Sequence, residues 1–249
     1  MTDIEPVVVL FKGGRLPTWH QLTPEERQRF EQAHVDLMLS VAAEHSMTRL
    51  EGFRLIGAHG DWQRFWLIEF PTMEGAEAWI QAEMAPDYGR FGHYDYHLSR
   101  SIEIGQLFDG WVTDPPNPVV PREEDPHTIP PLKIDPNSVV VLMFTRYRPG
   151  AESLSPEEKG EAEHIALMQE TAKQHGLMRL EGFQLIHPHS DWHRAWIAEF
   201  PSLEGAEAWI DAEEAVPHGM YTQRIIHLAR KWAPEYCASW AQSSSKGRS

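Results

Sequence analysis

The stretch RLEGFRLIGAHGDWQRFWLIEFPTMEGAEAWIQAE occupies residues 49–83, and it returns as RLEGFQLIHPHSDWHRAWIAEFPSLEGAEAWIDAE at residues 179–213. The offset is 130 residues (179 minus 49), and the match continues without a gap from Met47 to Arg100. About half of the aligned positions are identical. Because this spacing is far longer than the period of a solenoid repeat, the sequence indicates a duplicated domain.

The match also extends upstream of these blocks. VVVLF at Val7 corresponds to VVVLMF at Val139, and TPEE at Thr23 corresponds to SPEE at Ser155. These segments are offset by 132 residues (139 minus 7), so a two-residue indel separates them from the later block.

Each copy has the order strand, helix, strand, strand, helix, strand. In the first copy, apolar and β-branched runs predict strands at residues 7–11, 49–56, 64–70 and 93–101. A helix is expected to begin at Thr23, where a hydroxyl cap precedes proline and two acids, and a second helix follows Pro71. The order β-α-β-β-α-β is the ferredoxin-like unit of the α+β class, with two helices on one face of an antiparallel sheet. The other face needs a cover, so we expect the two copies to pack sheet to sheet.

The sequence between the copies contains eight of the 19 prolines and carries no periodic apolar pattern. Such a segment favours an extended connector. We therefore expect four parts: a first domain at 1–112, a proline-rich linker at 113–136, a second domain at 137–234, and a disordered polar tail at 235–249.

The segments IEFPTMEGAEAWIQAE and AEFPSLEGAEAWIDAE resemble the third strand and second helix of the dimeric α/β-barrel superfamily. The resemblance covers both repeats and implies an intramolecular dimeric α/β barrel. The superfamily includes cofactor-free monooxygenases, polyketide cyclases, muconolactone-type isomerases, haem-binding enzymes and small proteins of no known activity. It also implies that a ligand lies in the cleft between sheet and helices. Fold alone does not select among these activities.

Composition excludes several kinds of partner. The chain has 22 Lys and Arg against 37 Asp and Glu, a formal net charge of −15. So acidic a protein repels phosphate backbones and anionic membranes, which disfavours nucleic acid and membrane partners. The start of the sequence shows no apolar signal segment, and no stretch approaches the roughly 20 apolar residues of a membrane span. We expect a cytoplasmic protein that acts on a small molecule, as an intramolecular pseudo-dimer with further homodimerisation as an option.

Two residue pairs repeat on the helices. His34 and His164 lie on the apolar stripe of the first helix in each copy, where an imidazole could act as general acid or base, or ligate haem iron. Glu83 and Glu213 lie at equivalent positions of the second helix, and we expect a raised pKa if they face an apolar cleft. A histidine and a glutamate facing each other across the two helices would form a proton-transfer unit.

Further candidates lie where the copies diverge or repeat aromatic residues. Tyr88 aligns with His218 between the second helix and the last strand, and both are candidate catalytic partners. The last strand reads HYDY at residues 93–96 and QRII at residues 223–226, so the two clefts are expected to differ. The candidate substrate-binding residues, chosen because each repeats on a strand, are Trp66, Trp196, His97 and His227.

The hairpin loops carry a repeated histidine-x-aspartate-tryptophan pattern. It begins at His59 in the first copy and expands to HPHSDWH, residues 187–193, in the second. The first copy keeps only two possible ligands and no fourth ligand is evident, so an aspartate-stabilised turn is preferred to a metal site.

Three functions remain open on these residues. The preferred one is a small-molecule enzyme of cyclase, isomerase, lyase or dehydratase type that uses acid/base chemistry, without a cofactor, on an apolar or aromatic carbonyl substrate. The second is an oxidative enzyme, either a cofactor-free monooxygenase or a haem protein. The third is a non-catalytic ligand-binding or assembly module.

Overall fold

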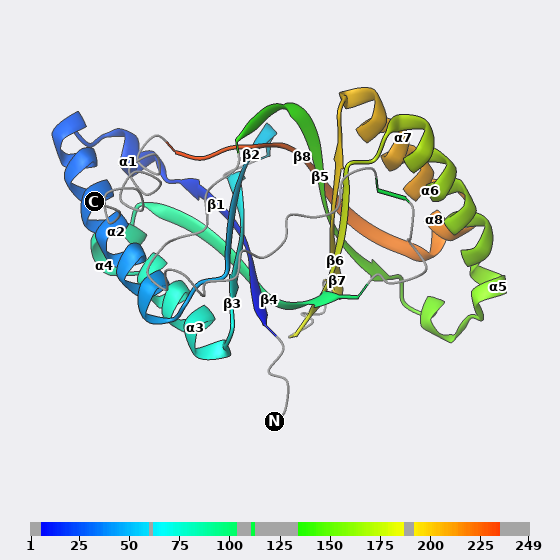
Figure 1. Ribbon diagram of the computed structural model, residues 1–249, viewed down its shortest axis with the longest axis horizontal. Coiled ribbons are helices and arrows are strands. Elements are labelled where there is room, and N and C mark those ends of the chain that lie inside the picture. Colours follow the sequence, from blue (N-terminus) through cyan, green and yellow to red (C-terminus); the bar gives the residue numbers. More distant parts are fainter. Residues whose placement is uncertain (1–5, 60–61, 104–110, 113–133, 187–191, 235–249) are drawn as a thin grey trace, which may run out of the picture. The chain divides into compact units, whose positions relative to one another are not determined.

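The computed structural model describes residues 6–59, 62–103, 111–112, 134–186 and 192–234, with two compact units among them (Figure 1). Described residues 6–100, 134 and 231–234 belong to the first unit, and described residues 101–112 and 135–230 belong to the second. The proline-rich segment and the polar tail expected from the sequence lie almost entirely outside the described residues. The predicted α+β class is confirmed, and each unit has the β-α-β-β-α-β order.

The elements of the first unit, in chain order, are β1 (Val7–Arg15), α1 (Pro17–His20), α2 (Pro24–Glu44), β2 (Arg49–His59), β3 (Trp62–Phe70), α3 (Met73–Glu83), α4 (Pro86–Gly89) and β4 (Gly92–Ile102). The sheet order is β4-β1-β3-β2, and the pairings β1–β3, β1–β4 and β2–β3 are antiparallel. Helices α2 and α3 pack against each other over one face of this sheet (Figure 1).

The second unit repeats this plan with β5 (Asp135–Tyr147), the 3₁₀ helix η2 (Ala151–Ser153), α5 (Pro156–Lys159), α6 (Glu161–His175), β6 (Arg179–Leu185), β7 (Arg194–Phe200), α7 (Leu203–Glu214), α8 (His218–Tyr221) and β8 (Thr222–Lys231). Its sheet order is β8-β5-β7-β6, the same arrangement as in the first unit. Helices α6 and α7 cover one face.

Both first helices begin with a capping box, as the TPEE and SPEE sequences predict. Thr23 and Glu26 exchange hydrogen bonds between side chain and backbone, and so do Ser155 and Glu158. Beyond the cap the two units differ. The 21-residue helix α2 runs without interruption, whereas Gly160, with a φ of 66°, separates α5 from α6.

The two-residue indel accounts for this break. His34 is 11 residues from its cap (34 minus 23), and His164 is nine residues from its cap (164 minus 155). Each helical residue turns the chain by about 100°, so a shortening by two would rotate the histidine by about 200° relative to the cap. The left-handed turn at Gly160 absorbs that rotation, and His164 keeps its place facing the sheet.

The buried core repeats position by position. In the second unit it contains Val139, Val141, Met168, Ala172, Leu177, Leu180, Ala198, Phe200, Ala206, Trp209, Ala212 and Trp111. Each of these except Trp111 has a buried counterpart at the aligned position of the first unit. The glycine of the repeated EGAEAW motif permits this packing, because a Cβ at Gly75 would lie 2.7 Å from the Phe70 ring and 3.0 Å from the His45 Cβ. The contact fixes α3 against the end of α2.

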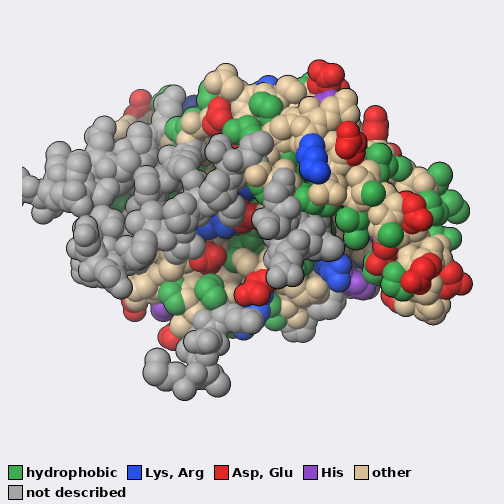
Figure 2. Space-filling model, turned by 45° about the vertical axis from the view of Figure 1, so that its right-hand side comes forward, with side chains coloured by type: hydrophobic (Ala, Val, Ile, Leu, Met, Phe, Trp, Pro, Cys, Tyr) green, Lys and Arg blue, Asp and Glu red, His purple; other side chains and the backbone are tan. Residues whose placement is uncertain are grey.

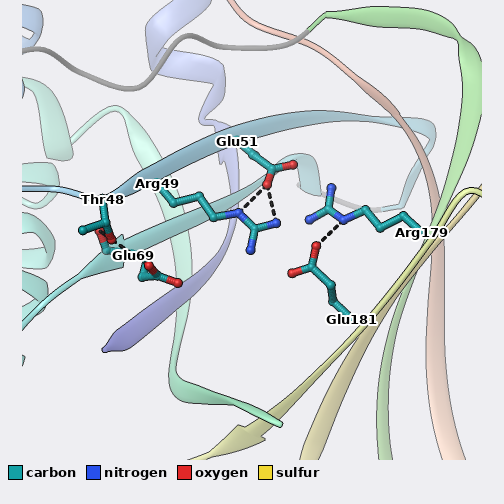
Figure 3. A network of polar contacts seen from close by, with 6 residues as sticks. All are labelled: Thr48, Arg49, Glu51, Glu69, Arg179 and Glu181. Atoms are coloured by element: carbon teal, nitrogen blue, oxygen red, sulfur yellow. Dashed lines mark hydrogen bonds and ion pairs between the residues drawn. The ribbon is translucent and has the colours of Figure 1, made fainter. Parts of the chain in front are cut away.

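Charged residues alternate with core residues along the second strand of each unit. Leu50 packs under the helices, so its neighbours Arg49 and Glu51 point to the opposite face of the sheet. Arg49 pairs with Glu51 on β2, and Thr48 donates to Glu69 over 2.7 Å (Figure 3). On β6, Arg179 and Glu181 form the same pair. In both units the arginine is thus paired with a glutamate two residues away on the same strand.

Each unit also includes an aromatic residue from a distant part of the chain. Trp232 belongs to the first unit, where its N–H donates to the Gly52 carbonyl over 2.8 Å and its ring contacts Trp66. Trp111 belongs to the second unit and is 2% exposed in that unit's core. Among the described residues, no helix combines the length and apolarity needed to cross a bilayer.

Candidate active site

The structure brings the predicted histidine and glutamate together in both units. His164 on α6 and Glu213 on α7 approach to 3.8 Å between Nε2 and Oε2, and His34 and Glu83 approach to 3.3 Å. Both pairs are largely buried. Each pair bridges the two helices on the side that faces the sheet, because each glutamate lies one turn beyond a core tryptophan, Trp79 or Trp209, on the same stripe.

The divergent pair Tyr88 and His218 stacks on these histidines. The rings of His34 and Tyr88 are 3.8 Å apart and tilted by 9°, and those of His164 and His218 are 4.0 Å apart and tilted by 15°. The first unit therefore has a neutral phenol against its histidine, whereas the second has another titratable imidazole.

The second unit contains a cavity of about 390 Å³ between its helices and its sheet. Its apolar wall is formed by Trp111, Met143, Ile165, Met168, Leu180, Trp196 and Trp209. Its polar wall includes Thr145, Arg146, Tyr147, Glu161, His164, Gln184, His193, Arg194, Glu213, His218, Thr222 and Arg224. A volume of this size falls within the range of about 300–1,000 Å³ that is typical of ligand and cofactor sites.

The equivalent cavity in the first unit has a volume of only about 40 Å³. Phe11 and Tyr94 line this space, with ring centroids 5.7 Å apart and the rings tilted by 38°, and Phe11 stacks on Tyr96 at 4.8 Å. Their counterparts in the second unit are Met143, Arg224 and Ile226, which leave it open.

A second group of side chains closes the same end of the first unit. The Arg15 guanidinium lies 4.3 Å from the Trp19 ring centroid and 4.1 Å from that of Tyr88. Trp19 comes from α1, and the second unit has a 3₁₀ helix rather than an α-helix between β5 and its capping box. The first unit is thus packed where the second unit is hollow.

Burial changes the protonation of the groups that line the larger cavity. It raises the pKa of Glu213 to about 7, against a smaller lowering by Arg224. Burial also lowers the pKa of His164 to about 4, with further lowering from His218 and Arg224. The pKa of His218 is lowered by the same kind of burial and by Arg224. Burial therefore favours the uncharged form of both imidazoles and of the Glu213 carboxyl group.

Three buried polar atoms in this cavity have no hydrogen-bond partner within the described part of the chain: His164 Nδ1, His218 Nδ1 and Arg224 Nε. Buried polar atoms are nearly always paired in native proteins, so a cluster of unpaired ones indicates a place for a polar ligand.

At the cavity edge, by contrast, Glu161 is fully engaged. It lies 2.9 Å from Lys159 Nζ and accepts from the Tyr147 hydroxyl over 3.2 Å, and the hydrogen bond from Lys159 lowers its pKa.

The candidate substrate-binding residues divide by sheet face. Trp66 and Trp196 line the two cavities. His97 and His227 are buried but line neither cavity. His97 lies 3.3 Å from Asp95, which pairs with Lys12 at 3.0 Å, on the face away from the helices. The direction of the last strand places these histidines there, since Tyr94 and Tyr96 alternate with them toward the cleft.

Arg224 and Thr222 belong to the site, and sequence reasoning did not single them out. The available signal was the alignment itself, in which Arg224 replaces Tyr94 at a position that lines the cleft. For the histidine-x-aspartate pattern, the side chains of His59, Asp61, His187, His189 and Asp191 lie outside the described residues. Within the described ranges, no three His, Cys, Asp or Glu side chains are grouped closely enough to hold a metal ion.

No protein-family model matches the chain, and no curated protein is similar to it in sequence. Solved structures do share its fold. Chlorite dismutase from Candidatus Nitrospira defluvii in complex with imidazole has a TM-score of 0.68 at 10% identity, over 97% of each chain. A mutant of that enzyme in complex with cyanide has a TM-score of 0.65 at 12% identity, over 93% of this chain and 92% of the other.

A structure described as a putative chlorite dismutase has a TM-score of 0.63 at 14% identity, over 92% of this chain and 95% of the other. Identities this low show the fold alone. The architecture predicted from the repeat is confirmed: the chain shares the fold of these structures, with two ferredoxin-like units in one polypeptide.

Proposed function

We propose that this protein is a haem-binding oxidative enzyme whose working site is the cavity of the second unit, with His164 as the iron ligand. The observation that carries the proposal is a buried, uncharged imidazole, with one unpaired ring nitrogen, in a cavity of about 390 Å³. Metal ligation requires a neutral imidazole, and histidine is a common axial ligand of haem iron.

The remaining residues of the cavity fit the same group. Glu213 lies 3.8 Å from Nε2 of His164, and metal-bound histidines commonly direct their other nitrogen to a carboxylate or carbonyl that fixes the ring. Trp196 and Trp209 offer flat apolar walls to a large planar ligand. Bound haem would supply the electron-transfer and oxygen chemistry that these side chains lack.

The comparisons support this choice over a cofactor-free lyase. The structural neighbours are chlorite dismutases, a class of haem enzymes, and two were solved with imidazole or cyanide, both of which are ligands of iron. If haem binds, His164 would hold the iron, Glu213 would orient the His164 ring, and the apolar wall would keep water out of the cavity.

Hemin titration of the purified protein tests the proposal. Wild-type protein is expected to develop a Soret band, and His164→Ala to weaken hemin binding by more than about 100-fold, because the axial ligand is lost. His34→Ala is the matched control. It removes the equivalent histidine from the unit whose cavity is only about 40 Å³, so hemin binding should stay at the wild-type value. Wild-type protein that remains colourless, or a His164→Ala variant that binds hemin normally, would contradict the proposal.

Acid/base catalysis without a cofactor is the second candidate, and the protonation of Glu213 favours it. A carboxyl group with a pKa of about 7 can both give and accept a proton at neutral pH, here on an apolar or aromatic carbonyl substrate. Its carboxyl ¹³C resonance, identified by its loss in Glu213→Gln, should titrate near pH 7. Colourless wild-type protein together with that titration would favour this function.

A further inference from the structure

Arg224 is a buried cation in the cavity of the second unit. Its side chain is 8% exposed, it donates to the Thr222 hydroxyl, and it lies 3.6 Å from Glu213. Its Nε has no hydrogen-bond partner among the described residues. A guanidinium carries five N–H donors, so much of its bonding capacity is unused although it has left water.

Glu213 leaves part of this guanidinium unbound. The two groups are 3.6 Å apart, which is longer than a hydrogen bond, and Glu213 also lies 3.8 Å from His164. The other acid of the cavity wall, Glu161, is already bound to Lys159 and Tyr147. Arg224 interacts with the charges of Glu213 and Glu214, but its Nε donor meets no acceptor among the described residues.

The fold itself does not need a cation at this position. The first unit has the same sheet, the same helices and the same core, and it places Tyr94 where the second unit has Arg224. General attraction of anions does not account for it either, because the chain carries a net charge of −15 and acidic side chains are scattered over the face that Figure 2 shows. The cation is specific to the cavity.

We propose that Arg224, together with Thr222, binds a carboxylate group of the molecule that enters this cavity. Arginine pairs with carboxylates through two parallel hydrogen bonds, and burial strengthens such a pair. The opposite wall of Met168, Leu180, Trp196 and Trp209 suits an aromatic or apolar body. The carboxylate is that of an organic substrate or a propionate of haem. The inference shares its cavity with the proposed function but does not depend on haem.

Two pairs of probes separate charge from shape. The first pair is 2-naphthoate and the neutral 2-naphthalenemethanol, and the second is hemin and its dimethyl ester, which lacks free carboxylates. Affinities are measured by calorimetry for naphthalenes and by absorbance for porphyrins. Arg224→Gln should weaken the binding of the acid in at least one pair by about 10-fold or more. The affinity for the neutral member of that pair should change by no more than about twofold. Arg224→Lys should recover part of the loss, and it also serves if Arg224→Gln fails to fold.

Arg54→Gln is the charge-matched control, because Arg54 is exposed and lines neither cavity. If Arg224→Gln lowers the affinity for 2-naphthoate only, Arg224 binds a substrate carboxylate. If it lowers the affinity for hemin only, Arg224 binds a haem propionate. Wild-type protein that prefers neither acid over its neutral partner, or an Arg224→Gln variant with unchanged preference, overturns the proposal. If the wild type binds no hemin, and Arg224→Gln lowers its affinity for 2-naphthoate, haem is rejected as the ligand and the carboxylate site at Arg224 is confirmed.

Discussion

Glu213 and His164 are shifted by the same burial in opposite directions. The folded-state pKa of Glu213 rises from 4.5 to about 7, so its contribution to stability is fully present below pH 4.5 and is lost as the pH rises toward 7. The folded-state pKa of His164 falls from 6.5 to about 4, so its contribution is fully present above pH 6.5 and is lost as the pH falls toward 4. Between pH 4.5 and 6.5 the two slopes oppose each other and largely cancel.

Replacement of Glu213 by Gln should expose the contribution of His164. The amide cannot ionise, so Glu213→Gln does not lose this contribution as the pH rises. The difference in unfolding free energy between Glu213→Gln and the wild type should therefore increase by about 3 kcal/mol from pH 4.5 to pH 7. Urea unfolding at several pH values measures this difference. Glu214→Gln removes a charge from an exposed neighbour and controls for net charge. Parallel stability profiles for Glu213→Gln and the wild type would show that burial does not raise the pKa of Glu213.

At the level of single residues, the sequence predicts the helical part of the site better than the strand part. His164 and Glu213 could be proposed because each repeats at the same place on an apolar helical stripe. Arg224 could not, because its role depends on which face of β8 it occupies and on the loss of the ring that Tyr94 supplies in the first unit. Contacts of that kind arise only when distant strands pair.

The break between α5 and α6 depends on one glycine. At Gly160 the backbone φ is 66°, and a Cβ there would lie 2.4 Å from Pro217 Cγ. Gly176 has nearly the same φ, 65°, but its added Cβ would meet no atom closer than 3.9 Å. These two positions therefore separate backbone strain from steric clash.

Gly176→Ala should cost about 1 kcal/mol of unfolding free energy from backbone strain alone. Gly160→Ala should cost about 2 kcal/mol or more, because Pro217 must also move. It should also disturb the cavity, since Glu161 and His164 follow the break directly. Urea unfolding of the two variants side by side checks the order, and equal losses would mean that the contact with Pro217 yields easily.

Regular elements of substantial length could be predicted from local patterns, and the interruptions could not. The capping boxes and the amphipathic stripes indicate both long helices of each unit. The end of β1 could not be predicted from the sequence. Lys12, Gly13 and Gly14 interrupt the apolar run, yet the strand continues to Arg15. The four-residue helices α1 and α4 were not predicted, since one turn leaves no periodicity to detect.

For the molecule as a whole, the two units should differ in occupancy. The cavity of the second unit holds about 390 Å³, and that of the first holds about 40 Å³, which is room for little more than a water molecule. We therefore expect hemin or 2-naphthoate to bind with a stoichiometry of one per chain. Titration at protein concentrations well above the dissociation constant measures this ratio. A ratio of two would mean that the aromatic rings of Phe11, Tyr94 and Tyr96 in the first unit move apart to admit a ligand.

The duplicated architecture could be predicted because the repeat covers nearly the whole core. Equivalent residues such as Met38 and Met168 recur at one offset, and a shared core implies a shared fold. The difference between the two cavities was expected from the divergence between β4 and β8. Which cavity stayed open could not be predicted, because it depends on how rings such as Phe11 and Tyr94 pack in three dimensions.

The placement of Trp111 and Trp232 bears on whether the chain can be divided into its two repeats. Trp111 precedes the linker in sequence yet completes the core of the second unit, and Trp232 follows the second unit in sequence yet contacts Gly52 of the first. A protease cut in the linker would leave each fragment carrying a tryptophan that belongs to the other. Each contiguous half therefore lacks an aromatic side chain that packs in its own unit, and both units need one continuous chain for a complete core.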